Sequence, residues 1–110
     1  MAWLFVATDP EGRSVGLNEE RWQQHIVARR PYMKNYVPDV QGAIARPQVI
    51  HMGNRPFTLV YTGQPFSSGF HRGEFIRAIA RFDRAHQRGE VLTAYITSQD
   101  YKGVTVWTPQ

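Results

Sequence analysis

The sequence predicts one small α+β domain, in which two N-terminal helices pack on an antiparallel sheet of roughly four strands. The chain has 110 residues, which is enough for one hydrophobic core. Both segments with helical spacing lie in its first half, whereas alternating apolar residues dominate its second half. We find no internal repeat and no linker, so residues 1–110 are expected to form a single domain.

The first half begins with a strand over residues 2–8 and a turn at residues 9–12, after which residues 13–16 can pair back. Asn18 is a good N-cap and acidic residues follow it, so a helix is predicted over residues 19–30, where Pro31 ends it. A second helix is predicted over residues 38–46, because its apolar residues recur at helical spacing and Pro47 follows.

The second half is read as strands over residues 48–52, 57–62, 74–83, 90–98 and 104–108. A long loop rich in glycine, serine and proline separates the second from the third. The 74–83 segment alternates clearly, although its alanines leave a helix as the competing interpretation. Its predicted helix-facing residues are Ile76, Ala78, Ala80 and Phe82.

Composition narrows the function classes. The net charge is +4, and of the thirteen basic residues only Lys34 and Lys102 are lysines. Arginine forks suit phosphate recognition, although mild basicity is common in small domains. Cysteine is absent, which excludes disulfides and thiolate chemistry. No apolar stretch is long enough for a membrane helix, and the opening residues lack a signal-peptide pattern, so a cytoplasmic protein without membrane contact is expected.

Two groups of residues could act on a phosphodiester. His25 and Arg29 are four apart on the first helix and therefore share a face, where a histidine beside a cation could transfer a proton. The alternative is a histidine that only serves packing. The second group would lie on the sheet face opposite the helices, where two cations and two hydroxyls could hold a phosphate and stack a base, or simply form a solvated face. Its members are Arg77, Arg81, Thr93 and Tyr95.

The remaining histidines show no metal-ligand spacing, so neither a metal nor a cofactor is expected. Residues 69–73 are not a P-loop, because no Gly-Lys-Ser/Thr follows them.

Residues 15–31, with the run Val-Gly-Leu-Asn-Glu-Glu-Arg-Trp-Gln-Gln-His-Ile-Val-Ala-Arg-Arg-Pro, resemble the opening of the phage-type barnase/EndoU/colicin/RelE-like nucleases, the BECR fold. The segment 91–95, with Thr-Ala-Tyr at its end, resembles a late strand of that family. The similarity covers roughly residues 13–97, and its motifs are short. Further matching positions are Met33, Tyr36, Val40, Ala43, Ile44, Pro47 and Ile50.

The resemblance implies N-terminal helices against a four-stranded antiparallel sheet and metal-independent ribonuclease activity of the toxin or effector type, with RNA and an antitoxin as partners. The matched catalytic positions are His25, Arg29, Arg81, Thr93 and Tyr95. Further RNA contacts are expected from Arg30, Arg77 and Lys102.

One position departs from the family pattern. The family's Arg-His-Pro is Arg29-Arg30-Pro31 in this chain, so an arginine replaces a functional histidine. Two hypotheses follow: an endoribonuclease in which the substrate's 2′-hydroxyl attacks the adjacent phosphate, or an inactive module that binds RNA or a protein. A DNA-binding protein is a third, although no helix-turn-helix spacing supports it.

Overall fold

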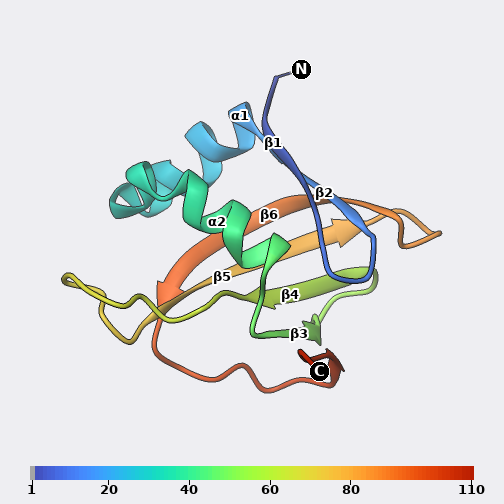
Figure 1. Ribbon diagram of the computed structural model, residues 1–110. Helices are drawn as coiled ribbons and strands as arrows, with labels where there is room; N and C mark the ends of the chain where they lie inside the picture. Colours follow the sequence, from blue (N-terminus) through green and yellow to red (C-terminus); the bar gives the residue numbers. More distant parts are fainter. Residues whose placement is uncertain (1) are drawn as a thin grey trace.

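A computed structural model describes residues 2–110 and contains a sheet covered on one face by short helices (Figure 1). The strands are β1 (Trp3–Thr8), β2 (Ser14–Asn18), β3 (Val49–Met52), β4 (Thr58–Thr62), β5 (Phe75–Phe82), β6 (Arg88–Thr97) and β7 (Thr105–Trp107). The helical segments are α1 (Glu19–Arg21), the π-helix η1 (Trp22–Val27), the 3₁₀-helix η2 (Pro31–Asn35) and α2 (Val37–Ala45).

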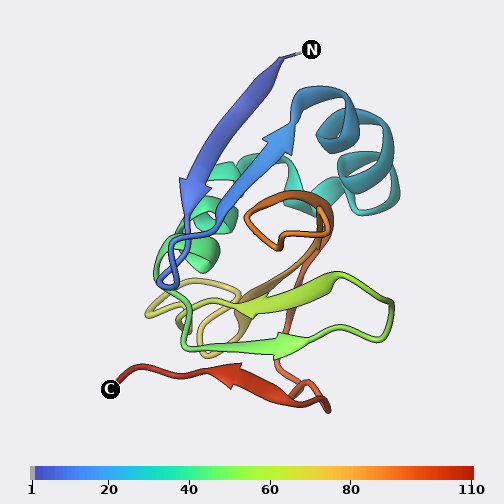
Figure 2. The ribbon, with the colours of Figure 1, turned by 90° about the vertical axis from the view of Figure 1, so that its right-hand side faces the viewer.

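The sheet has seven strands in the order β1-β2-β6-β5-β4-β3-β7. It is mixed, because β2 pairs with β6 in parallel through residues 14–16 and 88–90, whereas the other neighbours are antiparallel. In Figure 2, β7 lies beside β3 at one edge, and the β1–β2 hairpin is at the other. The prediction of two helices on a roughly four-stranded antiparallel sheet is therefore wrong, and so is the topology that the BECR resemblance implied.

The difference arises from pairing and not from the positions of the strands. Each expected strand is present within a few residues, and the 74–83 segment is a strand and not the competing helix. β3, β4, β5 and β6 form an antiparallel meander. The terminal strands then extend it on both sides, because β2 joins the free edge of β6 and β7 joins the free edge of β3.

The first helix is also irregular. Asn18 caps it as expected, because its Oδ1 accepts hydrogen bonds of 2.8 Å from the Glu20 N–H and 3.2 Å from the Arg21 N–H. One turn later the backbone becomes π-helical over η1, a widening that often occurs at functional sites. The predicted regular helix over residues 19–30 is thus wrong in its interior. The two α-helices in residues 2–110, α1 and α2, are short.

The core lies between the sheet and the helical layer. Trp22 and Ile26 of η1 are buried there, and so are Val40 and Ile44 of α2. α2 contacts β1, β4 and β5, so the helical layer covers one face of the sheet (Figure 1). On the other face the β4 residues Thr58, Val60 and Thr62 are also buried, whereas Arg81 of β5 is exposed and Thr93 and Tyr95 of β6 are partly exposed. No helix in residues 2–110 has the length and apolar character needed to cross a bilayer.

Candidate functional site

The sheet face away from the helices, which we call the open face, carries the predicted sheet residues. β5 buries Ile76, Ala78, Ala80 and Phe82 against the core, as predicted. The residues between them point the other way. Strand register then sets Arg77 beside Tyr95 and Ile79 beside Thr93, while Arg81 is paired with Glu90. The fold therefore brings Arg77, Arg81, Thr93 and Tyr95 onto one face of two adjacent strands.

A β-bulge interrupts this face at Leu92. Ile79 pairs with Thr93 and the next residue, Ala80, pairs with Val91, so Leu92 has no partner on β5. Because of this extra residue, Val91 and Ala94 both face the core, where both are fully buried. Strict alternation along the 90–98 strand would place Val91 on the same face as Thr93 and Tyr95, and the bulge is the reason that it does not.

Arg77 lies at the bottom of a pocket on the open face, which we call the Arg77 pocket. Its side chain is almost completely covered, with 4% of the residue exposed. The guanidinium carbon lies 5.4 Å from the centroid of the Phe75 ring and 5.6 Å from that of the Tyr101 ring. The Arg77 Nε donates a 3.2 Å hydrogen bond to Oγ1 of Thr62. The lining residues are Gln48, Val49, His51, Thr62, Phe75, Arg77, Asp100 and Tyr101.

His51 lines the same pocket from β3 and is 9% exposed. Its ring centroid lies 5.5 Å from that of Tyr101, and its Nδ1 is buried without a hydrogen-bond partner in residues 2–110. Burial, together with the positive charge of Arg77, lowers the pKa of His51 below 6.5. His51 is therefore neutral near pH 7 and retains an unused hydrogen-bonding atom.

Arg30 reaches the open face around the edge of the sheet. β2 pairs only with the start of β6, and the helical segments cover the rest of that edge. The Ile96 N–H there donates a 3.3 Å hydrogen bond to the Tyr32 hydroxyl. Arg30 follows η1 and places its guanidinium carbon 5.2 Å from the Tyr95 ring centroid, a cation–π contact. The arginine that departs from the family motif is thus joined to a predicted site residue.

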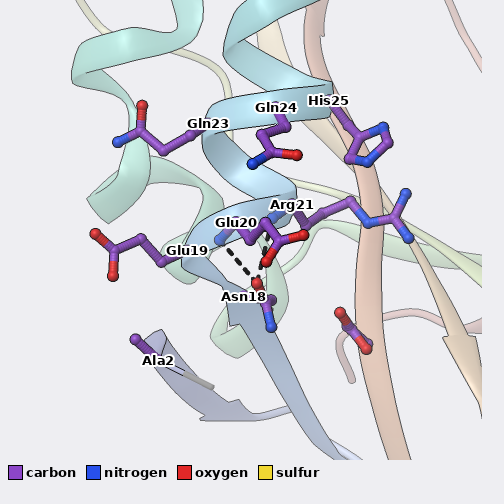
Figure 3. A pocket seen from close by; sticks show the side chains of 9 residues that line it. Ala2, Asn18, Glu19, Glu20, Arg21, Gln23, Gln24 and His25 are labelled. Atoms are coloured by element: carbon purple, nitrogen blue, oxygen red, sulfur yellow. Dashed lines mark hydrogen bonds between the residues drawn. The ribbon is translucent and has the colours of Figure 1, made fainter.

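His25 and Arg29 are exposed on the outer side of the first helical segment. His25 lines a surface hollow (Figure 3), in which its side chain and that of Arg21 extend to the same side of the helix. Residues of α1 and its cap line the hollow too, and Glu90 of β6 completes it. The structure therefore leaves His25 accessible and does not use it for core packing.

His25 and Arg81 line two different hollows. The hollow of Arg81 also contains Trp3, Gly16 and Arg88. Glu90 lines both, because it is the last β6 residue paired with β2 and is also the register partner of Arg81. Lys102 lies apart from both groups, exposed in the segment before β7.

The sequence interpretation missed four residues of these sites: His51, Thr62, Glu90 and Tyr101. Alternation in the 48–52 segment could have placed His51 on the open face, opposite the apolar Ile50. Nothing local indicates that Tyr101 returns over Arg77, because that contact depends on the path of residues 98–104.

Among residues 2–110, no group of three or more histidine, cysteine or acidic residues could hold a metal ion. No family model, curated protein or solved structure matches the chain. The open face and the two hollows are therefore the features that bear on function.

Proposed function

We propose that the chain binds single-stranded RNA across the open face of its sheet. The observation that carries this proposal is the register that pairs Arg77 with Tyr95 and brings Arg81 and Thr93 onto the same face of β5 and β6. Arginines can neutralise phosphates, a tyrosine ring can stack on a base, and a threonine hydroxyl can bond to phosphate or ribose. Together these groups match the chemistry of a single strand better than that of a base-paired groove.

The test is fluorescence anisotropy with a labelled single-stranded RNA, in EDTA and over a series of salt concentrations. Arg81→Gln removes one exposed cation from the open face, so binding should weaken and the slope of log K against log salt should fall by about 0.7. Arg46→Gln is the matched control, because Arg46 is exposed at the end of α2 in the helical layer. If the two variants weaken RNA binding equally, binding depends only on the net charge of the protein and not on the open face. Tighter binding to duplex DNA than to single-stranded RNA would favour a DNA-binding protein.

Cleavage of RNA is the second candidate function, and the position of Glu90 favours it. Glu90 lies between the hollows of His25 and Arg81, so two proton-transfer groups and a cation border a continuous stretch of surface. In the proposed reaction a 2′-hydroxyl oxygen bonds to the adjacent phosphorus, and the bond from phosphorus to the 5′-oxygen breaks. One of His25 and Glu90 accepts the 2′-hydroxyl proton, and the other donates a proton to the leaving oxygen.

In this reaction Arg29 and Arg81 would stabilise the charge that develops on the phosphorane. Thr93 would hydrogen-bond to the phosphate and Tyr95 would stack on a neighbouring base. Loss of one such group costs about a hundredfold or more in rate. His25→Ala and Glu90→Gln should each reduce cleavage by about that factor in EDTA, whereas His86→Ala, at the exposed tip of the β5–β6 hairpin, should not. An RNA with 2′-deoxyribose at the cleaved position should resist.

Binding without cleavage would identify the inactive module that the Arg30 replacement suggests. The cleavage assay therefore separates the two functions, because the binding residues Arg77 and Tyr95 lie on the sheet while His25 lies on the helical segment.

A further inference from the structure

The Arg77 guanidinium is a buried cation without a counterion. Arg77 is 96% covered, yet neither of the ion pairs found in residues 2–110 includes it: these join Arg13 to Asp9 and His71 to Glu74. Burying a charge costs several kcal/mol unless a partner compensates it. Among residues 2–110, the Arg77 side chain donates one hydrogen bond, to Thr62, and contacts the Phe75 and Tyr101 rings. The terminal guanidinium nitrogens are not among the buried unpaired atoms of residues 2–110, so they reach the pocket opening, where an anion can contact them.

The neighbouring groups can also donate hydrogen bonds. Thr62 accepts from Arg77, so its own hydroxyl proton is free to be donated into the pocket. The Nδ1 of His51 is buried and unpaired among the described residues. The terminal nitrogens of Arg77 form no hydrogen bond within residues 2–110. Donors on three strands thus converge on one pocket of about 240 Å³.

We propose that the Arg77 pocket binds the terminal phosphate, a phosphomonoester, of an RNA strand that lies on the open face. The RNA half of this statement rests on the proposed function, whereas the phosphate half rests on the pocket alone. A guanidinium fork is suited to a phosphate, and a hydroxyl and an imidazole can satisfy its other oxygens.

A terminal phosphate fits this pocket better than an internal one. A phosphomonoester has three unesterified oxygens and a charge of about −2, whereas a phosphodiester has two such oxygens and a single negative charge, so the former offers Arg77, Thr62 and His51 one oxygen each and attracts the guanidinium more strongly. The rings of Phe75 and Tyr101 enclose the guanidinium, which leaves little room for a chain that must both enter and leave. An end group needs a single exit.

The rest of the strand would leave along the open face. Arg77 is the register neighbour of Tyr95 on β6, and Thr93 and Ile79 form the next pair along. A base adjacent to the seated phosphate could therefore stack on the Tyr95 ring. Arg30 contacts the same ring from the edge of the sheet. Asp100 also lines the pocket and is exposed. Its carboxylate can accept a hydrogen bond from a ribose hydroxyl.

The experiment compares four forms of one short RNA: a phosphate or a hydroxyl at the 5′ end, and the same pair at the 3′ end, each labelled at the opposite end. One phosphorylated end should bind about tenfold more tightly than its hydroxyl counterpart, the value of one good charge-assisted contact. That difference should disappear in Arg77→Gln and persist in Arg46→Gln. In parallel, inorganic phosphate should raise the melting temperature of the wild-type protein, relative to chloride at equal ionic strength.

The outcomes separate the pocket from the proposed function. Equal binding of all four RNAs, with no effect of inorganic phosphate, would overturn the terminal-phosphate site and leave RNA binding intact. Stabilisation by inorganic phosphate through Arg77, without any RNA binding, would retain a phosphate site and reject RNA as its source. If Arg77→Gln does not fold, Tyr101→Leu and His51→Gln provide the same comparison, because both change the pocket and leave the guanidinium in place.

Discussion

The Tyr61 hydroxyl donates a 2.6 Å hydrogen bond to Oδ2 of Asp9, which precedes it by 52 positions. Both residues are buried, and the Arg13 guanidinium donates to the same oxygen at 2.8 Å. Oδ1 of Asp9 accepts from the N–H groups of Glu11 and Arg13, each at 2.9 Å. One carboxylate therefore organises the β1–β2 turn and fixes it to β4. Burial, and then the Asp9 hydrogen bond, raise the pKa of Tyr61.

Removing that hydroxyl should destabilise the fold without changing its shape. Tyr61→Phe keeps the ring in the core but leaves Asp9 with one fewer donor, and a hydrogen bond to a charged group contributes about 1.5–3 kcal/mol. We expect a loss of that size in the free energy of unfolding, measured with urea. Tyr32→Phe is the control, because Tyr32 is exposed and its hydroxyl makes a longer bond. Equal losses in the two variants would contradict a special role for the Asp9 contact.

The local signals in the sequence predicted local structure well. Asn18, the two acids after it and Pro31 correctly placed the beginning and end of the first helical segment, and alternation correctly assigned the buried face of β5. These features depend on neighbours within a few positions, which is why a single sequence reveals them.

The sheet pairing depends on contacts far apart in the sequence. β2 pairs with β6 through residues such as Val15 and Gly89, which are far apart in the sequence. No local pattern indicates that these two strands run parallel. The π-helical turn and the bulge at Leu92 each shift the backbone by about one residue, a change that hydrophobic spacing alone does not encode. The Arg77 pocket could not be predicted from the sequence for the same reason, because Tyr101, which contacts Arg77, lies in the segment after β6.

The N-cap of the first helical segment should be measurable as a local contribution to stability. The Asn18 side chain accepts two backbone hydrogen bonds, so Asn18→Ala should cost about 1 kcal/mol in the free energy of unfolding. Asn18→Asp should retain most of it, because a carboxylate also caps and suits the helix dipole. Urea titration followed by circular dichroism compares the three proteins. If Asn18→Asp loses as much as Asn18→Ala, the cap geometry is not what stabilises this end.

The free energy of unfolding should decrease at acidic pH because of His51. Its pKa is below 6.5 in the folded protein, owing first to burial and then to Arg77, whereas the unfolded chain protonates it normally. The unfolded state therefore binds more protons, and stability is lost as the pH falls from about 6.5 downwards. The other titratable groups around the pocket are Asp100 and Tyr101.

Urea midpoints between about pH 7.5 and pH 5.5 test this expectation. The wild-type midpoint should decrease more steeply than that of His51→Gln, whereas the exposed variant His25→Gln should retain the wild-type slope. Parallel slopes for wild type and His51→Gln would show that another group causes the acid dependence.

Arg77 should reduce stability in exchange for binding. Its charge is buried without an ionic partner in the described part of the chain, and burying an uncompensated charge costs several kcal/mol. Arg77→Met should therefore unfold at the same or a higher urea concentration than the wild type. The same variant should lose the stabilisation by inorganic phosphate and bind RNA more weakly. If Arg77 served only packing, Arg77→Met would unfold at a lower urea concentration than the wild type. Its removal would then leave Thr62 unpaired and the Phe75 and Tyr101 rings without their contact. The sign of the change in unfolding free energy thus distinguishes an arginine retained for an anion from one retained for packing.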